Sequence, residues 1–268
     1  MIDHGKHNIL GIGVNAVDYE AAVATIIAAA VERRPMAVSA LAVHGVMTGV
    51  LDAEQRYRLN HLDLVLPDGQ PVRWALNLLH HAALPDRVYG PTLTLKLCEE
   101  AARRELPIFL YGSRPEVLQA LQTNLCARFP GLRIAGAQPS RFRRIDAAER
   151  AATVAAIQAS GAALVFVGLG CPRQEVWAYE YRDQLAMPLI AVGAAFDFHA
   201  GLLAQAPPRL QRFGLEWAYR LLKEPRRLWR RYVLLNPLYL ALLALQIFRL
   251  KRFSPATARK PERDLGYG

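Results

Sequence analysis

Short apolar runs rich in β-forming residues alternate along the chain with longer segments whose apolar residues recur every three or four positions. The short runs predict strands, and the longer segments predict amphipathic helices. Strands that alternate with helices of this length indicate crossover units, so we expect an α/β fold with a largely parallel sheet flanked by helices. The predicted strands are 9–14, 37–43, 62–66, 108–111, 132–137, 163–167 and 189–194, and clear helical segments are 19–31, 92–103, 116–128 and 147–159.

This alternation stops after about residue 202. Residues 207–231 have the pattern of a basic amphipathic helix, in which Pro225 is a point where the helix can break. An apolar stretch of 17 residues follows from Tyr232 to Phe248, at the short edge of what can span a bilayer. We therefore predict a core over 1–202, a helical appendage over 203–253 and a disordered tail over 254–268. Whether the apolar stretch spans a membrane or lies on it stays open.

The formal net charge of +10 favours an anionic partner: nucleic acid, anionic lipid or a phosphorylated substrate. Basic residues are concentrated in 220–231, where Glu224 is the single acid. Trp217, Tyr219 and Trp229 are interleaved with them, which is typical of a membrane interface because aromatic rings settle at headgroup depth. A nucleic-acid surface would not need the apolar stretch that follows. We therefore predict an anionic membrane surface as a partner, and no nucleic acid.

The three cysteines, Cys98, Cys126 and Cys171, are widely spaced and form no C-x-x-C pair. This spacing speaks against a disulfide framework or a zinc site and favours a reducing compartment. The polar N-terminus lacks the basic-then-apolar order of a signal peptide. We expect the protein to stay in the cytosol or on its membrane surface.

Asp68 is the first residue with candidate chemistry, because it directly follows a predicted buried strand and precedes Gly69. A carboxylate at a strand end can act as a general base that takes a proton from an attacking hydroxyl. The alternative is an Asp-Gly turn, in which the side chain bonds only its own backbone.

The turn Gly168–Glu175 is the second candidate, because glycines there precede a helix that starts at a proline. Exposed backbone N–H groups at a helix start favour phosphate, and Gly168 and Gly170 allow close approach of a ligand. Gln174 would project from the first helical turn toward a base or ribose. The alternatives are an ordinary strand-to-helix turn and a capping or solvated glutamine. A similar turn follows strand 108–111, where Ser113 is the predicted N-cap.

A third candidate, 192–201, places small residues at a strand end, where Gly193 permits close approach of a ligand or of another backbone segment. Asp197 and His199 could serve in a site there, although a lone acid or histidine beside aromatic residues is more often structural. No Ser/His/Asp order, paired Cys/His set or HExxH helix is present, so a protease, an esterase or a zinc enzyme has little support. We predict no metal site.

In the appendage, Arg220, Arg227 and Arg230 fall on roughly one helical face if the helix continues past Pro225. Guanidinium groups suit bidentate contact with phosphate, so these residues could hold a diphosphate. They could also meet anionic headgroups, or form an ordinary solvated surface.

Together these segments resemble the WecG/TagA/CpsF family of glycosyltransferases (glycosyltransferase family 26), from about Gly11 to Phe248. The resemblance is carried by R-V-Y-G at 87–90, G-L-G-C-P-R-Q-E at 168–175, V-G-A-A-F-D-F-H-A-G at 192–201 and the long ordered segment 214–232. It implies a Rossmann-like catalytic core with an appendage that reaches the membrane. It also implies an inverting, metal-independent hexosyl or N-acetylhexosaminyl transferase that needs no cofactor.

The resemblance further implies a UDP-sugar donor and a polyprenyl-diphosphate-linked saccharide as acceptor, in the synthesis of a bacterial cell-surface polysaccharide such as exopolysaccharide. The enzyme would work at the cytoplasmic face of the inner membrane, as a peripheral or monotopic protein. Asp68 matches the general base, Arg87 a motif arginine near the site, and Gln174 a residue at the nucleotide. Arg220, Arg227 and Arg230 match appendage arginines that close the site over phosphate.

The chain departs from the family pattern after the second predicted strand, where Ala42 replaces a threonine and His44 the usual asparagine. His44 is therefore included as a candidate site residue. These changes leave the transferred sugar open between N-acetylmannosamine, its uronic acid and glucose, and homo-oligomerisation also stays open. One alternative is a nucleotide-binding oxidoreductase or other Rossmann enzyme, but Gly11-Ile12-Gly13-Val14 lacks the third glycine of a dinucleotide fingerprint. The other is a non-catalytic nucleotide-binding or membrane-surface scaffold, or a nucleic-acid binder.

Overall fold

The computed structural model describes the backbone of all 268 residues and every side chain except those of Pro208, Arg227, Arg230 and Arg231. The strands are β1 Asp3–Ile9, β2 Ile12–Val17, β3 Met36–Leu41, β4 Leu64–Pro67, β5 Ile108–Gly112, β6 Ile134–Gln138, β7 Leu164–Gly168 and β8 Pro188–Ala191. The helices that accompany them are α1 Tyr19–Val31, α2 Val43–Leu51, α3 Ala53–Asn60, α4 Gln70–His80, α5 Gly90–Arg103, α6 Pro115–Arg128, α7 Ala147–Ala159, α8 Arg173–Tyr181 and α9 Ala195–His199.

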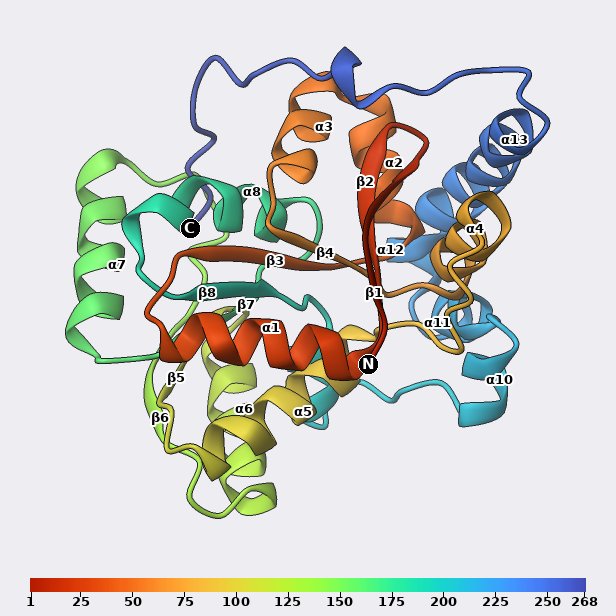
Figure 1. Cartoon of the computed structure of the whole chain (residues 1–268). Coiled ribbons are helices and arrows are strands. Elements are labelled where there is room, and N and C mark those ends of the chain that lie inside the picture. Colours follow the sequence, from red (N-terminus) through yellow and green to blue (C-terminus); the bar gives the residue numbers. More distant parts are fainter.

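A parallel six-stranded sheet in the order β4-β3-β8-β7-β5-β6 forms the centre of the molecule (Figure 1). Successive strands are joined through helices, because parallel neighbours need a crossover connection. The α/β fold with a parallel sheet, predicted from the alternating pattern, is confirmed, and so is the Rossmann-like core that the family resemblance implies. Since all six strands run the same way, their carboxyl ends lie along one edge of the sheet.

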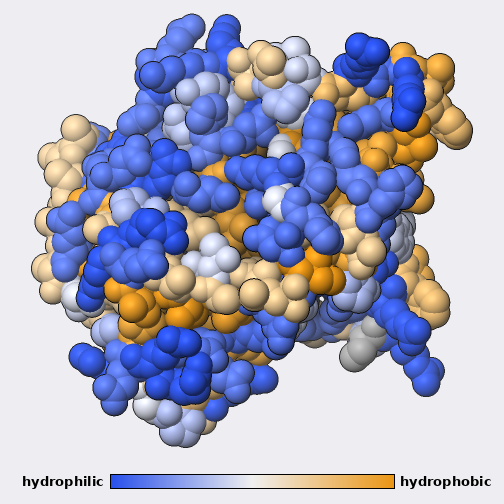
Figure 2. Space-filling model, viewed as in Figure 1, coloured by the Kyte–Doolittle hydropathy of each residue, from blue (hydrophilic) through white to orange (hydrophobic). Residues whose placement is uncertain are grey.

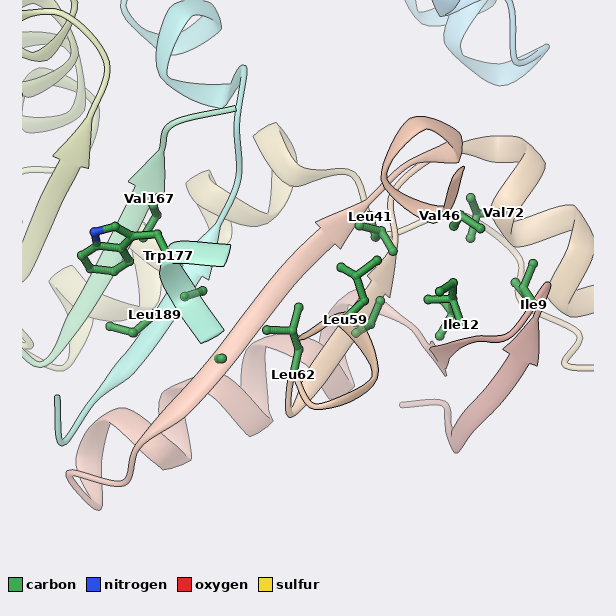
Figure 3. Close-up of a cluster of buried hydrophobic side chains, with 14 of the residues drawn as sticks. Ile9, Ile12, Leu41, Val46, Leu59, Leu62, Val72, Val167, Trp177 and Leu189 are labelled. Atoms are coloured by element: carbon green, nitrogen blue, oxygen red, sulfur yellow. The ribbon is translucent and has the colours of Figure 1, made fainter. Parts of the chain in front are cut away.

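Both faces of the sheet are covered, so its strands are apolar on both sides. One hydrophobic cluster joins alternate strand residues such as Leu41, Val167 and Leu189 to the helices α2, α3, α4 and α8 (Figure 3). The residues that point the other way, among them Val38 and Phe166, pack against α1, α5, α6 and α9. Figure 1 shows α1, α5 and α6 on one side of the sheet and α3 and α8 on the other.

The prediction of a single strand over 9–14 is wrong, because these residues contain the turn of an antiparallel hairpin. β1 and β2 pair through Ile9 and Ile12, and Leu10 and Gly11 between them have φ angles of 53° and 88°. Two positive φ values in a two-residue loop match the tight hairpin turns whose twist suits the flanking strands. The hairpin lies beside β4, where Asn15 Oδ1 accepts a hydrogen bond from Val65 N at 2.8 Å.

Helix α2 was not delineated from the sequence, because Gly45 and Gly49 weaken its helical pattern. The structure explains both glycines by close packing. A Cβ atom at Gly45 would lie 2.3 Å from Leu41 Cδ1, and one at Gly49 would lie 2.5 Å from Ile12 Cδ1. These glycines therefore let α2 approach the sheet and the hairpin, at the cost of helix propensity.

The appendage consists of short helices rather than one helix over 207–231. They are α10 Pro208–Arg212, α11 Glu216–Lys223, α12 Pro225–Arg230, the π-helical turn η2 Arg231–Leu235 and α13 Asn236–Ile247. The predicted break at Pro225 is confirmed, and a second break follows α10, where Gly214 has a φ of 70°. The appendage contacts the core; for example, Tyr239 OH donates to the Pro71 carbonyl at 3.1 Å. Whether residues 1–202 and 203–253 are separate domains stays a prediction.

Large apolar side chains are exposed on the appendage. Figure 2 shows hydrophobic surface where Figure 1 places α13, and the exposed residues of this region include Leu238, Leu240, Ile247, Phe248 and Leu250. None of the helices in the described part of the chain has both the length and the apolar character needed to cross a bilayer.

The tail, expected from its polar composition to be disordered, follows the core surface in the structure (Figure 1). The Glu180 carboxylate accepts hydrogen bonds from the backbone N–H groups of Leu265 and Gly266, at 2.6 and 3.0 Å. The Gly266 carbonyl in turn accepts from Ile145 N at 2.7 Å. Composition gave no sign of these partners, because they come from the segment before α7 and from α8, which are distant in the sequence.

Candidate active site

A cleft of about 990 Å³ lies at the carboxyl edge of the sheet. Its walls come from the turns that follow β3, β4, β5, β7 and β8, and from the appendage helices α11 and α12. Ligands of open α/β sheets bind at this edge. Nine of the predicted site residues line this cleft: His44, Asp68, Arg87, Gly168, Gly170, Gln174, Gly193, Asp197 and Arg220. The side chains of Arg227 and Arg230 lie outside those described.

Asp68 lies at the end of β4 and is more than a turn-forming residue. Its backbone N–H donates to the Leu41 carbonyl at 3.3 Å, and its Oδ1 accepts from Gly90 N at 3.3 Å. Burial raises the pKa of this carboxyl to about 6, although Arg87, the Gly90 N–H and Arg220 act to lower it. A pKa near 6 makes Asp68 a stronger base than a solvated aspartate while it still remains ionised at neutral pH.

Arg87 is fixed by a group of residues that we call the Arg87 cluster: Arg87, Tyr89, Gln211 and Glu216. Arg87 Nη2 lies 2.7 Å from Glu216 Oε2 and 3.1 Å from Gln211 Oε1. Tyr89 OH donates to Glu216 Oε1 at 2.9 Å, and the guanidinium lies 4.1 Å from the centre of the Tyr89 ring. Two core residues and two appendage residues thus form one buried network beside Asp68.

Arg220, on α11, faces the cleft with hydrogen-bonding capacity to spare. Its guanidinium lies 5.6 Å from the centre of the Phe198 ring, and its Nη2 is 3.9 Å from Glu224 Oε2. Its Nε is buried and has no hydrogen-bond partner among the described residues. A buried donor without a partner is costly, so a ligand oxygen at this place would stabilise it.

The turn after β7 is braced from within by Gln174. The Gln174 Oε1 accepts from Gly170 N at 3.1 Å, and its Nε2 donates to Glu175 Oε1 at 2.9 Å. Ser39 OH donates to the same Glu175 oxygen at 3.0 Å. Gln174 is therefore largely occupied in holding the turn, and it can offer a ligand only its remaining N–H or lone pair.

Of the two glycines predicted for ligand approach in this turn, Gly168 is explained by packing, because a Cβ there would lie 2.6 Å from Phe196 Cδ2. Gly170 has a φ of 77° and open space around it, which suits approach of a ligand. The predicted N-cap role of Ser113 is wrong: Arg114 occupies the cap position of α6, and Ser113 has a φ of 58°.

At the end of β8, Gly193 has a φ of 56°, and a Cβ atom there would lie 3.2 Å from Gln174 Oε1. Asp197 follows on α9 and lines the cleft, while its carbonyl accepts from Leu202 N and Leu203 N. His199 is not among the residues that line the cleft. Its Nε2 is 2.8 Å from the Pro91 carbonyl, and burial lowers the pKa of its ring. His199 therefore packs beside the cleft as a structural residue and does not line the site.

Three polar residues of the cleft were missed in the sequence. Glu216 anchors the Arg87 cluster, Glu175 is fully buried with its pKa raised by burial, and Gln70 follows Asp68 at the start of α4. Glu175 Oε2 and Gln70 Oε1 have no hydrogen-bond partner among the described residues. The one available signal for Glu216 was an acid in the first turn of a basic helix. Within the described part of the chain, no group of three or more His, Cys, Asp or Glu is placed to hold a metal ion.

The fold and the cleft define an α/β protein with an open cleft at the carboxyl edge of a parallel sheet, under an appendage that carries arginine. The model of the WecG/TagA/CpsF glycosyl transferase family matches residues 7–253, so the chain belongs to this family. Transfer of a glycosyl group is the activity that this membership gives the protein. The match ends at the start of the tail.

Proposed function

We propose that the protein transfers a hexosyl or N-acetylhexosaminyl group from a UDP-sugar to a hydroxyl of a polyprenyl-diphosphate-linked saccharide. The product is a precursor of a bacterial cell-surface polysaccharide. The observation that carries this proposal is a partly buried carboxylate with a pKa near 6, Asp68, beside two arginines in one cleft. A base and fixed cations are what transfer from a nucleoside diphosphate requires.

In the proposed reaction, Asp68 takes the proton of the acceptor hydroxyl as its oxygen bonds to the anomeric carbon. The bond between that carbon and the diphosphate oxygen breaks, and UDP leaves from the opposite face, so the configuration inverts. The Arg220 guanidinium, with its buried Nε, offsets the charge that grows on the leaving diphosphate. Arg227 and Arg230 remain proposed partners of phosphate, as does His44 for the donor or acceptor.

The donor is assigned to the side of the cleft formed by Gly170, Gln174 and Gly193. Gly170 leaves open space at the start of α8, where backbone N–H groups favour a diphosphate. Asp197, on the same side, is an acceptor suited to a nucleoside. No step of this scheme requires a metal or a cofactor.

The appendage supports a membrane location for the acceptor. Exposed apolar residues such as Trp229, Val233 and Leu240 accompany a run of basic residues, as in helices that lie in the interface of anionic bilayers. We assign the enzyme to the cytoplasmic face of the inner membrane, bound from one side.

Asp68→Asn tests the catalytic assignment. The amide cannot accept the proton, so turnover is expected to fall roughly 10²–10⁴-fold, while the affinity for UDP measured by calorimetry stays close to that of the wild type. Asp183→Asn, at a side chain that is 80% exposed, is the matched control and should leave turnover unchanged. Wild-type turnover in Asp68→Asn would remove Asp68 from the mechanism.

Screening radiolabelled UDP-sugars against membrane-extracted lipid acceptors identifies the sugar.

A further inference from the structure

The carboxylate of Glu216 connects the appendage to the core at the carboxyl edge of the sheet. Glu216 begins α11, and its two oxygens contact two core residues, Arg87 at 2.7 Å and Tyr89 at 2.9 Å. The Arg87 and Glu216 side chains are only 8% and 12% exposed. A charge pair this far from solvent is costly to form and still more costly to break on one side. Its place beside Asp68 therefore calls for an explanation beyond surface pairing.

The position of the Arg87 guanidinium is determined by the appendage. Glu216 and Gln211 both accept from its Nη2, while the Tyr89 ring supports the guanidinium face. Gln211 is itself held by donating to the Ala206 carbonyl at 2.8 Å. Arg87 therefore has a fixed orientation whenever α10 and α11 are docked on the core.

Two carboxylates compete for this one cation. Asp68 and Glu216 both act on Arg87, and among the described residues it is Glu216 that forms the ion pair. The charged and titratable groups that face Asp68 are Arg87, Tyr89, Glu216, Arg220 and Tyr19. If Arg87 paired fully with Asp68, the carboxylate would become a weaker base, because an adjacent cation stabilises its ionised form.

We propose that Glu216 is a positioning residue of the transferase site, which holds Arg87 beside Asp68 without letting the two form a closed ion pair. Asp68 thereby stays available to take the proton of the acceptor hydroxyl. Glu216 touches neither substrate nor the reacting atoms in this scheme, and it acts through Arg87. The inference rests on the proposed role of Asp68 as the base. In this scheme the Asp68 carboxylate has the proton affinity that the reaction needs only while the appendage is docked on the core.

The test is the pH dependence of kcat/KM in Glu216→Gln. The amide keeps the size of the side chain but removes the charge that holds Arg87, so Arg87 should turn to Asp68. The acid limb of the profile is expected to move down by about one pH unit, with a lower rate on the plateau. Glu99→Gln, at an exposed acid on α5, changes the net charge equally and should leave the limb in place. Glu216→Asp, which keeps the charge on a shorter side chain, should give an intermediate limb and guards against misfolding of the amide variant.

The Arg87→Gln background separates positioning from a simple charge effect. If Glu216 acts through Arg87, adding Glu216→Gln in this background should move the limb much less than it does in the wild type. An equal movement of the limb in both backgrounds overturns the proposal, and so does an unmoved limb in Glu216→Gln when the Asp68 pKa is also unchanged.

Titration of Asp68 by carboxyl NMR in the free protein distinguishes failure of the positioning role from failure of the proposed function. A lower Asp68 pKa in Glu216→Gln, together with an unchanged rate profile, would keep the positioning role and refute Asp68 as the base. An unchanged Asp68 pKa would refute the positioning role while leaving the mechanism intact.

Discussion

Asp68 shows how one residue can be unfavourable for stability and useful for chemistry. Burial raises the pKa of its carboxyl, and the arginines that favour the ionised form do not fully offset that effect. At neutral pH the folded protein therefore ionises this carboxyl group at a cost that a solvated aspartate does not have. In the proposed mechanism this cost has a use, because a proton acceptor with a pKa near 6 is more effective than a solvated one.

The cost of ionising the buried Asp68 carboxyl predicts that Asp68→Asn is more stable than the wild type at high pH. The folded-state pKa of about 6 lies above the ordinary value of 3.8, so the contribution of Asp68 to stability is most favourable at low pH and is lost as pH rises through about 6. Asparagine is neutral throughout. Its melting temperature should exceed that of the wild type at pH 8, and the gap should close near pH 4. Thermal unfolding at both pH values measures this, and a variant that is less stable at pH 8 would contradict it.

Single residues were predictable from the sequence where their place in the fold follows from a strand end. Asp68 and Gln174 each come directly after a recognisable strand or turn, so the carboxyl edge of the sheet brings them together. Glu216 could not be found in this way. An acid in a basic helix reads as a solvated residue, and only the docking of α11 shows that it meets Arg87.

At the scale of elements, boundaries were accurate for two helices that begin at a side-chain cap, Asp18 for α1 and Asp146 for α7. The predicted helices 19–31 and 147–159 coincide with α1 and α7. Where glycine serves packing, as in α2, the periodic signal is weak and the helix was missed. The hairpin was read as one strand because its tight turn contains Leu10, an apolar residue.

Gly193, in the turn after β8, lies against Gln174, which braces the turn after β7. This contact leads to a prediction for Gly193→Ala. Alanine at a φ of 56° costs roughly 1–2 kcal/mol of stability. Its Cβ would also press on Gln174 Oε1, so the brace on the Gly170 turn should loosen and UDP binding should weaken. Gly161→Ala is the matched control, since its φ is 72° and its surroundings are open. Chemical denaturation should show similar losses for both variants, and calorimetry should show weaker UDP binding only for Gly193→Ala. Equal UDP affinity in the two variants would refute the bracing role.

At the scale of the whole molecule, the tail joins the segment before α7 to α8. Ser140 OH donates to the Gly268 carbonyl at 2.7 Å, and Gly268 N donates to the Arg143 carbonyl at 3.1 Å. The same loop carries Phe142, which lines the cleft. The tail, which lies beyond the family match, therefore supports a wall of the site from behind.

Removing residues 254–268 is expected to lower stability by about 1–3 kcal/mol, because the buried Glu180 carboxylate loses two N–H donors. Hydrogen exchange should become faster in residues 140–146. Asp264→Asn, which removes only the partly exposed pair with Arg150, should cost less than about 1 kcal/mol. Unchanged exchange in 140–146 after truncation would show that the tail does not support this loop.

The N-terminal hairpin has a consequence for the order of events during synthesis. Leu10 N bonds Gln246 Oε1, Gln246 Nε2 bonds the Asn8 carbonyl, and Asn8 Nδ2 bonds the Phe253 carbonyl, across separations of 236, 238 and 245 residues. The hairpin is synthesised well before residues 246 and 253, so these polar groups stay unsatisfied until both residues have been added. Contacts that span so much chain form slowly. A nascent chain stalled before residue 246 would therefore expose a hairpin that lacks these hydrogen bonds.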